Sequence, residues 1–228
     1  MKMQDRVIAQ MEKDFNEMLS HDLNGQNWDC VIIPDVGDGK EGTALAEPGI
    51  ETRCECYSKG GRSDKPQFRT MLSVPIHCGD MAHIPAQDMF YLLELEPQQE
   101  VNCHSTLATP CNGRITVTFK QDDTLTVDGY LLEKGGILEV IEDIPCVVRK
   151  NPTYTTANGT PGMIVMDDMT VTLQRNRYSE QIQRGQEVRL KDDSKTYTIT
   201  DIVINGNPQT EKGIIRLSCR AIAGGITQ

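Results

Sequence analysis

The chain has 228 residues, a length that suits one large β domain or two small ones. Its net charge is −10 and it has no long run of Lys and Arg, which argues against proteins that hold nucleic acid by the phosphates. Acidic residues interrupt the N-terminal stretch, and no apolar run reaches the length of a bilayer. We therefore expect no signal peptide, no membrane span and synthesis in a cytoplasm.

A single amphipathic helix is predicted in the segment 1–24. Apolar side chains recur on one face at helical spacing: Val7, Met11, Phe15, Met18 and Leu19. Asn24 and Gly25 end the pattern. No second helical stripe follows in the sequence. The apolar face therefore either packs on the protein's own sheet or docks on another subunit or protein, and the pattern leaves both open.

The segment 25–112 is predicted to form a first β unit. Its strand-like runs are Trp28–Pro34, Ile50–Tyr57, Phe68–Val74, Met81–Ile84, Met89–Leu95 and Glu100–Leu107. Alternating apolar residues in these runs indicate strands with one buried face. Two glycine-containing stretches, 35–46 and 58–66, read as loops.

A pattern in this unit returns 106 residues later without a gap. Gly79 matches Gly185 and Tyr91 matches Tyr197. Three apolar positions also match: Ala82 with Val188, Ile84 with Leu190 and Leu93 with Ile199. In each copy a glycine permits the turn that starts a hairpin, and the period of two buries one set of side chains. The pattern predicts an internal duplication.

The rest of the chain is predicted as a β meander that connects the two units, in the segment 113–148, followed by a second β unit in the segment 149–228. In the second unit, Met169, Val171 and Leu173 are expected to face the same core. The expected fold is therefore mainly β, with two small barrel or sandwich units after one N-terminal helix.

No catalytic, cofactor or metal site is expected from the sequence. The best metal candidates are His77, Cys78, His83, Cys103, His104 and Cys111, but their spacing is not that of a structural zinc site. Cys54 and Cys56 stand too close for a zinc knuckle, and nothing near Cys78 or Cys103 indicates an activated thiol. The stretch 37–43 lacks the spacing of a phosphate-binding loop. Without a secretory signal, the eight cysteines are expected to be free thiols.

Three stretches together resemble the head–tail connector, or neck, proteins of long-tailed bacteriophages. They are "QFRTMLSVPIHCGDMAHIPAQDMFYLLEL", then "PCNGRITV" with "IPCVVRKNPTYTTA", and then "MTVTLQRNRYSEQIQRGQEVRLKDDSKTYTITDI" with "GIIRLSC". The second copy carries the more specific pattern, and the match covers most of the segment 68–222. A leading helix also fits this family of small β-barrel proteins, which are called head-closure, stopper or head–tail joining proteins.

The resemblance implies a structural protein of the virion neck, assembled in the host cytoplasm and without catalytic residues. Copies of the chain are expected to form a ring between the portal or adaptor protein of the head and the tail proteins. DNA is expected to pass through this ring without specific binding, because an acidic wall does not retain it. The helical stripe of Val7, Met11, Phe15, Met18 and Leu19 is the expected contact with the head-side ring.

Three other readings stay open. Within the virion, the chain is alternatively a tail terminator or another protein associated with the tail tube. A metal-dependent enzyme would use the histidines and cysteines named above. A nucleic-acid-binding module of the OB type would need aromatic platforms on a basic groove, and this acidic chain with 5% aromatic residues fits that poorly.

Overall fold

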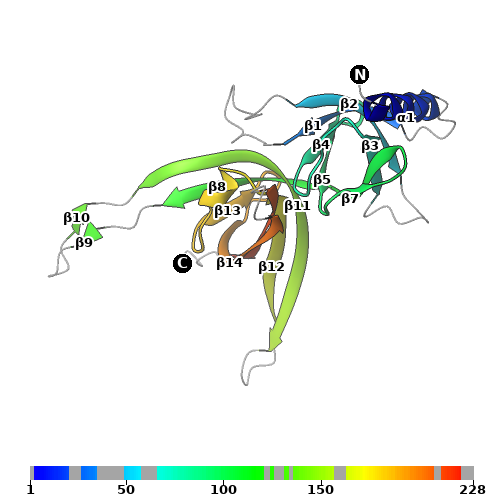
Figure 1. Ribbon diagram of the computed structural model, residues 1–228. Helices are drawn as coiled ribbons and strands as arrows, with labels where there is room; N and C mark the ends of the chain where they lie inside the picture. Colours follow the sequence, from blue (N-terminus) through cyan, green and yellow to red (C-terminus); the bar gives the residue numbers. More distant parts are fainter. Residues whose placement is uncertain are drawn as a thin grey trace.

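The computed structural model describes residues 3–20, 27–34, 49–57, 66–120, 124–125, 131–133, 136–156, 163–207 and 212–221. The predicted loop 35–46, most of the predicted loop 58–66 and the C-terminal tail lie outside the described residues. The described residues form one α-helix followed by fifteen strands, with short 3-10 helices at Pro85–Gln87 and Ser179–Gln181. Figure 1 shows their arrangement. The predicted helix is α1 (Met3–Ser20).

The first unit is a closed barrel of six antiparallel strands. Its strands are β1 (Asn27–Ile33), β2 (Ile50–Tyr57), β3 (Gln67–Met71), β4 (Met81–Ile84), β5 (Met89–Leu93) and β7 (Cys103–Pro110). They pair in the order β3-β2-β1-β4-β5-β7, and β3 pairs with β7 to close the barrel. The short strand β6 (Gln98–Gln99) pairs with β7. Inward side chains such as Ile32, Phe68 and Leu93 fill the interior, because alternate residues of a strand point to the same face.

The second unit is also a closed six-stranded antiparallel barrel. Its strands are β8 (Gly113–Lys120), β11 (Ile137–Thr156), β12 (Met163–Gln174), β13 (Glu187–Leu190), β14 (Thr196–Asn207) and β15 (Lys212–Ala221). Met169, Val171 and Leu173 face its core as predicted. The small hairpin of β9 (Thr124–Leu125) and β10 (Leu131–Glu133) lies between β8 and β11.

The boundary predicted at residue 148 is wrong. The segment 113–148 is not a separate meander, because β8 and the first part of β11 are two of the six strands of the second barrel. β8 closes that barrel by pairing with β13, about 70 residues further along the chain. Such a long-range pairing leaves no local signal in the sequence, whereas the turns on either side of β9 and β10 suggested an independent unit.

The two barrels have the same topology. Taken in chain order, the six strands of each barrel are arranged 1-2-3-6-5-4 around the wall. The registers also agree: Ala82 pairs with Tyr91 and Val188 pairs with Tyr197, each at the position 106 residues from its counterpart. This agreement supports the internal duplication predicted from the repeated pattern.

The two glycines that open the repeated pattern have the same conformation and the same hydrogen bonds. Gly79 has φ +92° and Gly185 has φ +87°, in the region that favours glycine. Gly79 N–H donates to Leu93 O at 2.7 Å, and Gly185 N–H donates to Ile199 O at 2.8 Å. The predicted role of both glycines at the start of a hairpin is confirmed.

Candidate functional site

The junction between the barrels is an apolar interface that the sequence analysis did not identify. Buried residues from both barrels form one cluster: Ile33, Cys78, Met81, Leu92, Val147 and Ile214. The hairpin of β14 and β15 brings Ile214 and Gly213 against the first barrel, where a side chain on Gly79 would meet Gly213 O. Gln174 Nε2 donates to Ile33 O and Pro34 O, both at 3.1 Å. These contacts hold the two barrels together.

A sequence signal for this junction exists. Met81, Phe90 and Leu92 are apolar although they alternate with the inward-facing residues of β4 and β5, so these strands are apolar on both faces. The positions 106 residues later are Glu187, Thr196 and Thr198, which suit a solvent-facing wall. A strand that is apolar on both faces is buried on both faces. The difference between the two copies therefore marks the covered face of the first barrel.

One ion pair crosses the junction. The Asp80 carboxyl is 1% exposed, and Lys212 Nζ lies 3.0 Å from its Oδ1. His77 N–H donates to Asp80 Oδ2 at 2.8 Å. Burial raises the pKa of Asp80, while Lys212 and the hydrogen bond from His77 act in the opposite direction. A buried carboxylate tolerates this position because Lys212 from the other barrel compensates it.

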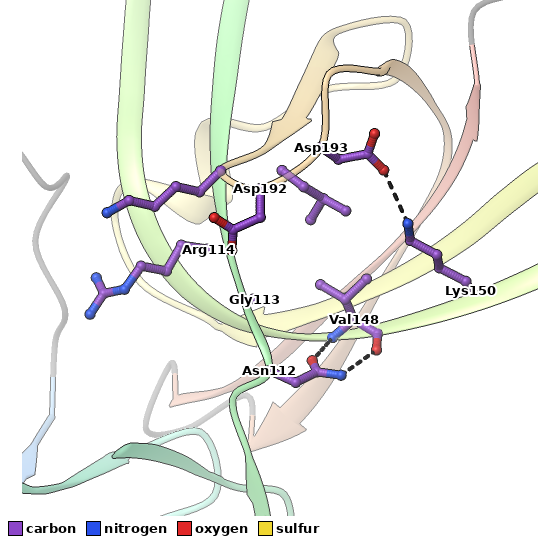
Figure 2. Close-up of a pocket in the computed structure, with 9 residues that line it drawn as sticks. Asn112, Gly113, Arg114, Val148, Lys150, Asp192 and Asp193 are labelled. Carbon is purple, nitrogen blue, oxygen red and sulfur yellow. Dashed lines mark hydrogen bonds and ion pairs between the residues drawn. The ribbon is translucent and has the colours of Figure 1, made fainter. Parts of the chain in front are cut away.

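A groove of about 290 Å³ opens on the second barrel beside the junction (Figure 2). Gly113, Val148 and Leu190 contribute to its lining, together with Asn112, Arg114, Lys150, Lys191, Asp192 and Asp193. The Asn112 amide extends the β ladder past the end of β8, since its Nδ2 donates to Val148 O at 2.9 Å and its Oδ1 accepts from Val148 N–H at 2.6 Å.

The charges around the groove are paired with one another. Asp143, at a bulge of β11 with φ 57°, accepts from Arg114 at 2.9 Å and from Lys191 at 3.0 Å. Lys150 Nζ lies 3.1 Å from Asp193 Oδ2. Hydrogen bonds from Lys195 N–H, Lys150 and Tyr197 lower the pKa of Asp193 to about 2. Because each of these cations has a carboxylate partner, the groove presents a charge-balanced polar surface.

The helical stripe is divided between the protein's own core and its surface. Phe15 is fully buried against Cys103 and Met71 of the first barrel. Glu12 Oε1 accepts from Ser73 N–H at 2.8 Å, which fixes the helix near the end of β3. Met11 is half-buried. The side chain of Leu19 lies outside the described residues.

The exposed part of α1 includes a residue that the sequence analysis did not select. Val7, Ile8 and Met18 are 46%, 43% and 44% exposed. Ile8 was missed because it stands next to the predicted stripe rather than on it. Of the two readings left open, the first holds for Phe15, which packs on the protein's own barrel, while Val7, Ile8 and Met18 are exposed.

The histidines and cysteines weighed as metal ligands have separate environments. Cys78 Sγ donates to Glu94 O at the junction, Cys103 lies under α1, and the His83 ring stacks on Phe90 at 4.3 Å. His104 Nε2 lies 3.2 Å from Leu72 O. Over the residues that the structure describes, no three His, Cys, Asp or Glu side chains are grouped to hold a metal ion. All eight cysteines are free thiols.

Burial governs the chemistry of most of these thiols. It raises the pKa of Cys56 to about 12 and that of Cys78 to about 11. Such thiols stay protonated at neutral pH and pack as small apolar groups.

Comparison with protein-family models, curated proteins and solved structures found no match to this chain. In the described part of the chain, no helix has the length and apolar character needed to cross a membrane.

Proposed function

We propose that the chain is a structural protein of the neck of a long-tailed bacteriophage. Copies of it form a ring that joins the portal or adaptor protein of the filled head to the tail and lets DNA pass. The resemblance of the sequence to head–tail connector proteins motivates this proposal. One structural observation supports it most: the joined pair of barrels carries α1 with exposed apolar residues at one end and the long hairpin of β11 and β12 at the other (Figure 1).

The first of these elements is the uncovered part of α1. Val7, Ile8 and Met18 remain exposed although Phe15 anchors the helix to the first barrel. Exposed apolar residues on an anchored helix are suited to a groove of another protein. In the neck, this surface is the contact with the head-side ring.

The second element is the long hairpin of β11 and β12, which leaves the second barrel on the side away from α1 (Figure 1). Near its start, β15 places Gly213 and Ile214 at the junction with the first barrel. Its last residues lie beside the start of this hairpin, because Arg220 pairs with Asp168. The hairpin therefore points away from the first barrel, as a contact with the next component requires.

The acidic character of the chain is compatible with a DNA passage. A net charge of −10 repels the phosphate backbone, so DNA is expected to slide rather than to bind. A protein between head and tail must release the DNA at ejection, and weak attraction favours release.

The test uses variants of the exposed helix residues in particles. We expect the triple change Val7→Ser, Ile8→Ser and Met18→Ser to leave the barrels folded and to give filled heads without attached tails in electron micrographs. Lys13→Ser with Glu17→Ser, which alters the exposed polar side of the same helix, is the matched control and should give joined particles. Joined particles from the triple variant, or absence of the chain from purified particles, contradicts the proposal.

A further inference from the structure

The outer face of the second barrel carries two exposed arginines, Arg149 on β11 and Arg216 on β15. In the part of the chain that the structure describes, neither guanidinium has a carboxylate within ion-pair distance. Other cations of this barrel are compensated, as Arg220 is by Asp168 at 3.1 Å. The two arginines are therefore free to bind an anion from outside the barrel.

The strand register brings these arginines onto one surface. β12 lies between β11 and β15, where Thr170 pairs with Arg149 on one side and with Ser218 on the other. Arg216 stands two residues before Ser218 and therefore shares its face. The arginines are two strand spacings apart across the sheet, about 10 Å. We call Arg149, Thr170, Arg216 and Ser218 the arginine patch.

Hydroxyl groups lie between the two positive charges. Asn151 Nδ2 donates to Thr170 Oγ1 at 3.3 Å, so the Thr170 hydroxyl can donate its own hydrogen to a ligand. Ser218 provides a second hydroxyl in the same row of the ladder. The patch thus combines charged and neutral hydrogen-bond donors on a flat sheet surface.

The carboxylates beside the patch do not cancel its charge. Asp168, the outward residue before Thr170 on β12, accepts from Arg220 Nε at 3.1 Å. Asp201, which pairs with Ser218 in the ladder, forms an ion pair with Arg184. Two uncompensated positive charges therefore remain at the patch, although the net charge of the chain is −10.

We propose that the arginine patch binds the phosphate backbone of DNA without reading its sequence. Guanidinium groups bind phosphate oxygens through charge-assisted hydrogen bonds, and serine and threonine hydroxyls commonly add to such contacts. None of the four residues of the patch is aromatic, so bases have no platform there on which to stack. The patch is suited to the outside of a duplex.

Two such contacts in an acidic chain give weak binding that depends on salt. Contacts of this kind let DNA slide along a protein surface, because they involve only the phosphates. The choice of DNA as the ligand rests on the proposed function, in which DNA passes through the ring. The patch then marks the wall of the second barrel that faces the passage.

The test compares two double variants that lose the same charge. Arg149→Gln with Arg216→Gln removes the patch. Arg177→Gln with Arg189→Gln is the matched control, since both residues are exposed and β13, which carries Arg189, is three strands away from β12 around the barrel. Circular dichroism should show both variants folded, because all four side chains are on the surface.

Fluorescence anisotropy of labelled duplex DNA, titrated at several salt concentrations, gives the binding constants. We expect the wild type to bind weakly at low salt. For the patch variant, the plot of log binding constant against log salt concentration should be less steep by about 2, because two phosphate contacts are lost. The control should keep the wild-type slope. Equal slopes for the two variants, or no binding by the wild type at low salt, overturn the proposal.

The alternative ligand is an acidic surface of a second copy of this chain. Native mass spectrometry tests it: loss of an assembly by the patch variant, with DNA binding unchanged, would assign the patch to that contact and overturn the proposal. Particles that contain the patch variant should still have heads joined to tails. Failure of the patch to bind DNA is thus seen separately from failure of the chain to join heads and tails.

Discussion

Tyr91 and Tyr197 occupy the same place in the two barrels. Each is buried, and each hydroxyl donates a hydrogen bond to the side chain four residues earlier, to Gln87 Oε1 in one barrel and to Asp193 Oδ2 in the other, both at 3.0 Å. Both barrels thus have a polar anchor for a large core side chain, with an amide acceptor in the first and a carboxylate acceptor in the second.

This shared anchor predicts matched losses of stability. Tyr91→Phe and Tyr197→Phe each remove one hydrogen bond without opening a cavity, so each should lower the free energy of unfolding by about 1 kcal/mol. Urea unfolding of both variants measures the effect. A loss at one site with none at the other would show that the two tyrosines are not equivalent.

The two equivalent glycines provide a second matched pair. Gly185→Ala places a methyl group in open space. It is expected to lower the free energy of unfolding by only about 1 kcal/mol, because alanine must adopt the positive φ of this position. At Gly79 the new Cβ would lie 1.9 Å from Gly213 O of the other barrel. The cost should therefore rise to about 3 kcal/mol, because the barrels must also move apart.

Calorimetry gives the two stabilities, and limited proteolysis near Cys111 and Asn112, between the barrels, reports their separation. Gly79→Ala should be cleaved there faster than Gly185→Ala. Equal stability and equal cleavage of the two variants would contradict the tight approach at the junction.

Removal of Lys212 should destabilise the junction in a pH-dependent way. Lys212→Met leaves the Asp80 carboxylate buried without its partner, and we expect a loss of about 2 kcal/mol near pH 7, less than for a fully buried pair because Lys212 is partly exposed. The pKa of Asp80 is already raised by burial and should rise further in the variant. A carboxyl with a raised pKa destabilises the fold as pH increases, so acidification should recover part of the loss.

The double variant Asp80→Asn with Lys212→Met tests the cause. It removes the buried charge together with its partner, and it should be more stable than Lys212→Met alone at neutral pH. Thermal unfolding across pH provides the measurement, and a pH-independent loss in the single variant would refute the role of Asp80 ionisation.

Asp193 should stabilise the second barrel in the opposite pH range. Its pKa is lowered to about 2, below the value of about 4 of an unfolded aspartate. The ionised carboxylate therefore contributes fully above about pH 4, and its contribution is lost as pH falls towards 2. Asp193→Asn should be less stable than the wild type at neutral pH, and the difference should shrink between these two values.

Acid titration of unfolding, followed by circular dichroism, measures this difference. Asp192→Asn is the control, because it removes the neighbouring carboxylate without breaking the hydrogen bonds of Lys150, Lys195 and Tyr197. A constant difference between wild type and Asp193→Asn across this pH range contradicts the predicted linkage.

Local patterns predicted the hairpins well. Gly79 and Gly185 require a backbone that other residues adopt at a cost, and the alternation after each glycine has a single register that buries its apolar side. A repeat of these features was therefore enough to predict two β units. The helix predicted in the segment 1–24 is found at Met3–Ser20, because its stripe has a helical period and no strand period.

The closure of the barrels and the candidate binding surfaces were decided by tertiary structure. Whether β8 joins a barrel depends on its pairing with β13, and whether Phe15 is buried or available depends on the distance of α1 from Cys103. The apolar outer face of β4 and β5 was visible in the sequence, but only the position of Ile214 showed what covers it. Periodicity reports which residues share a face, because it follows from backbone geometry. It does not report which face meets which partner, because that depends on contacts between residues far apart in the chain.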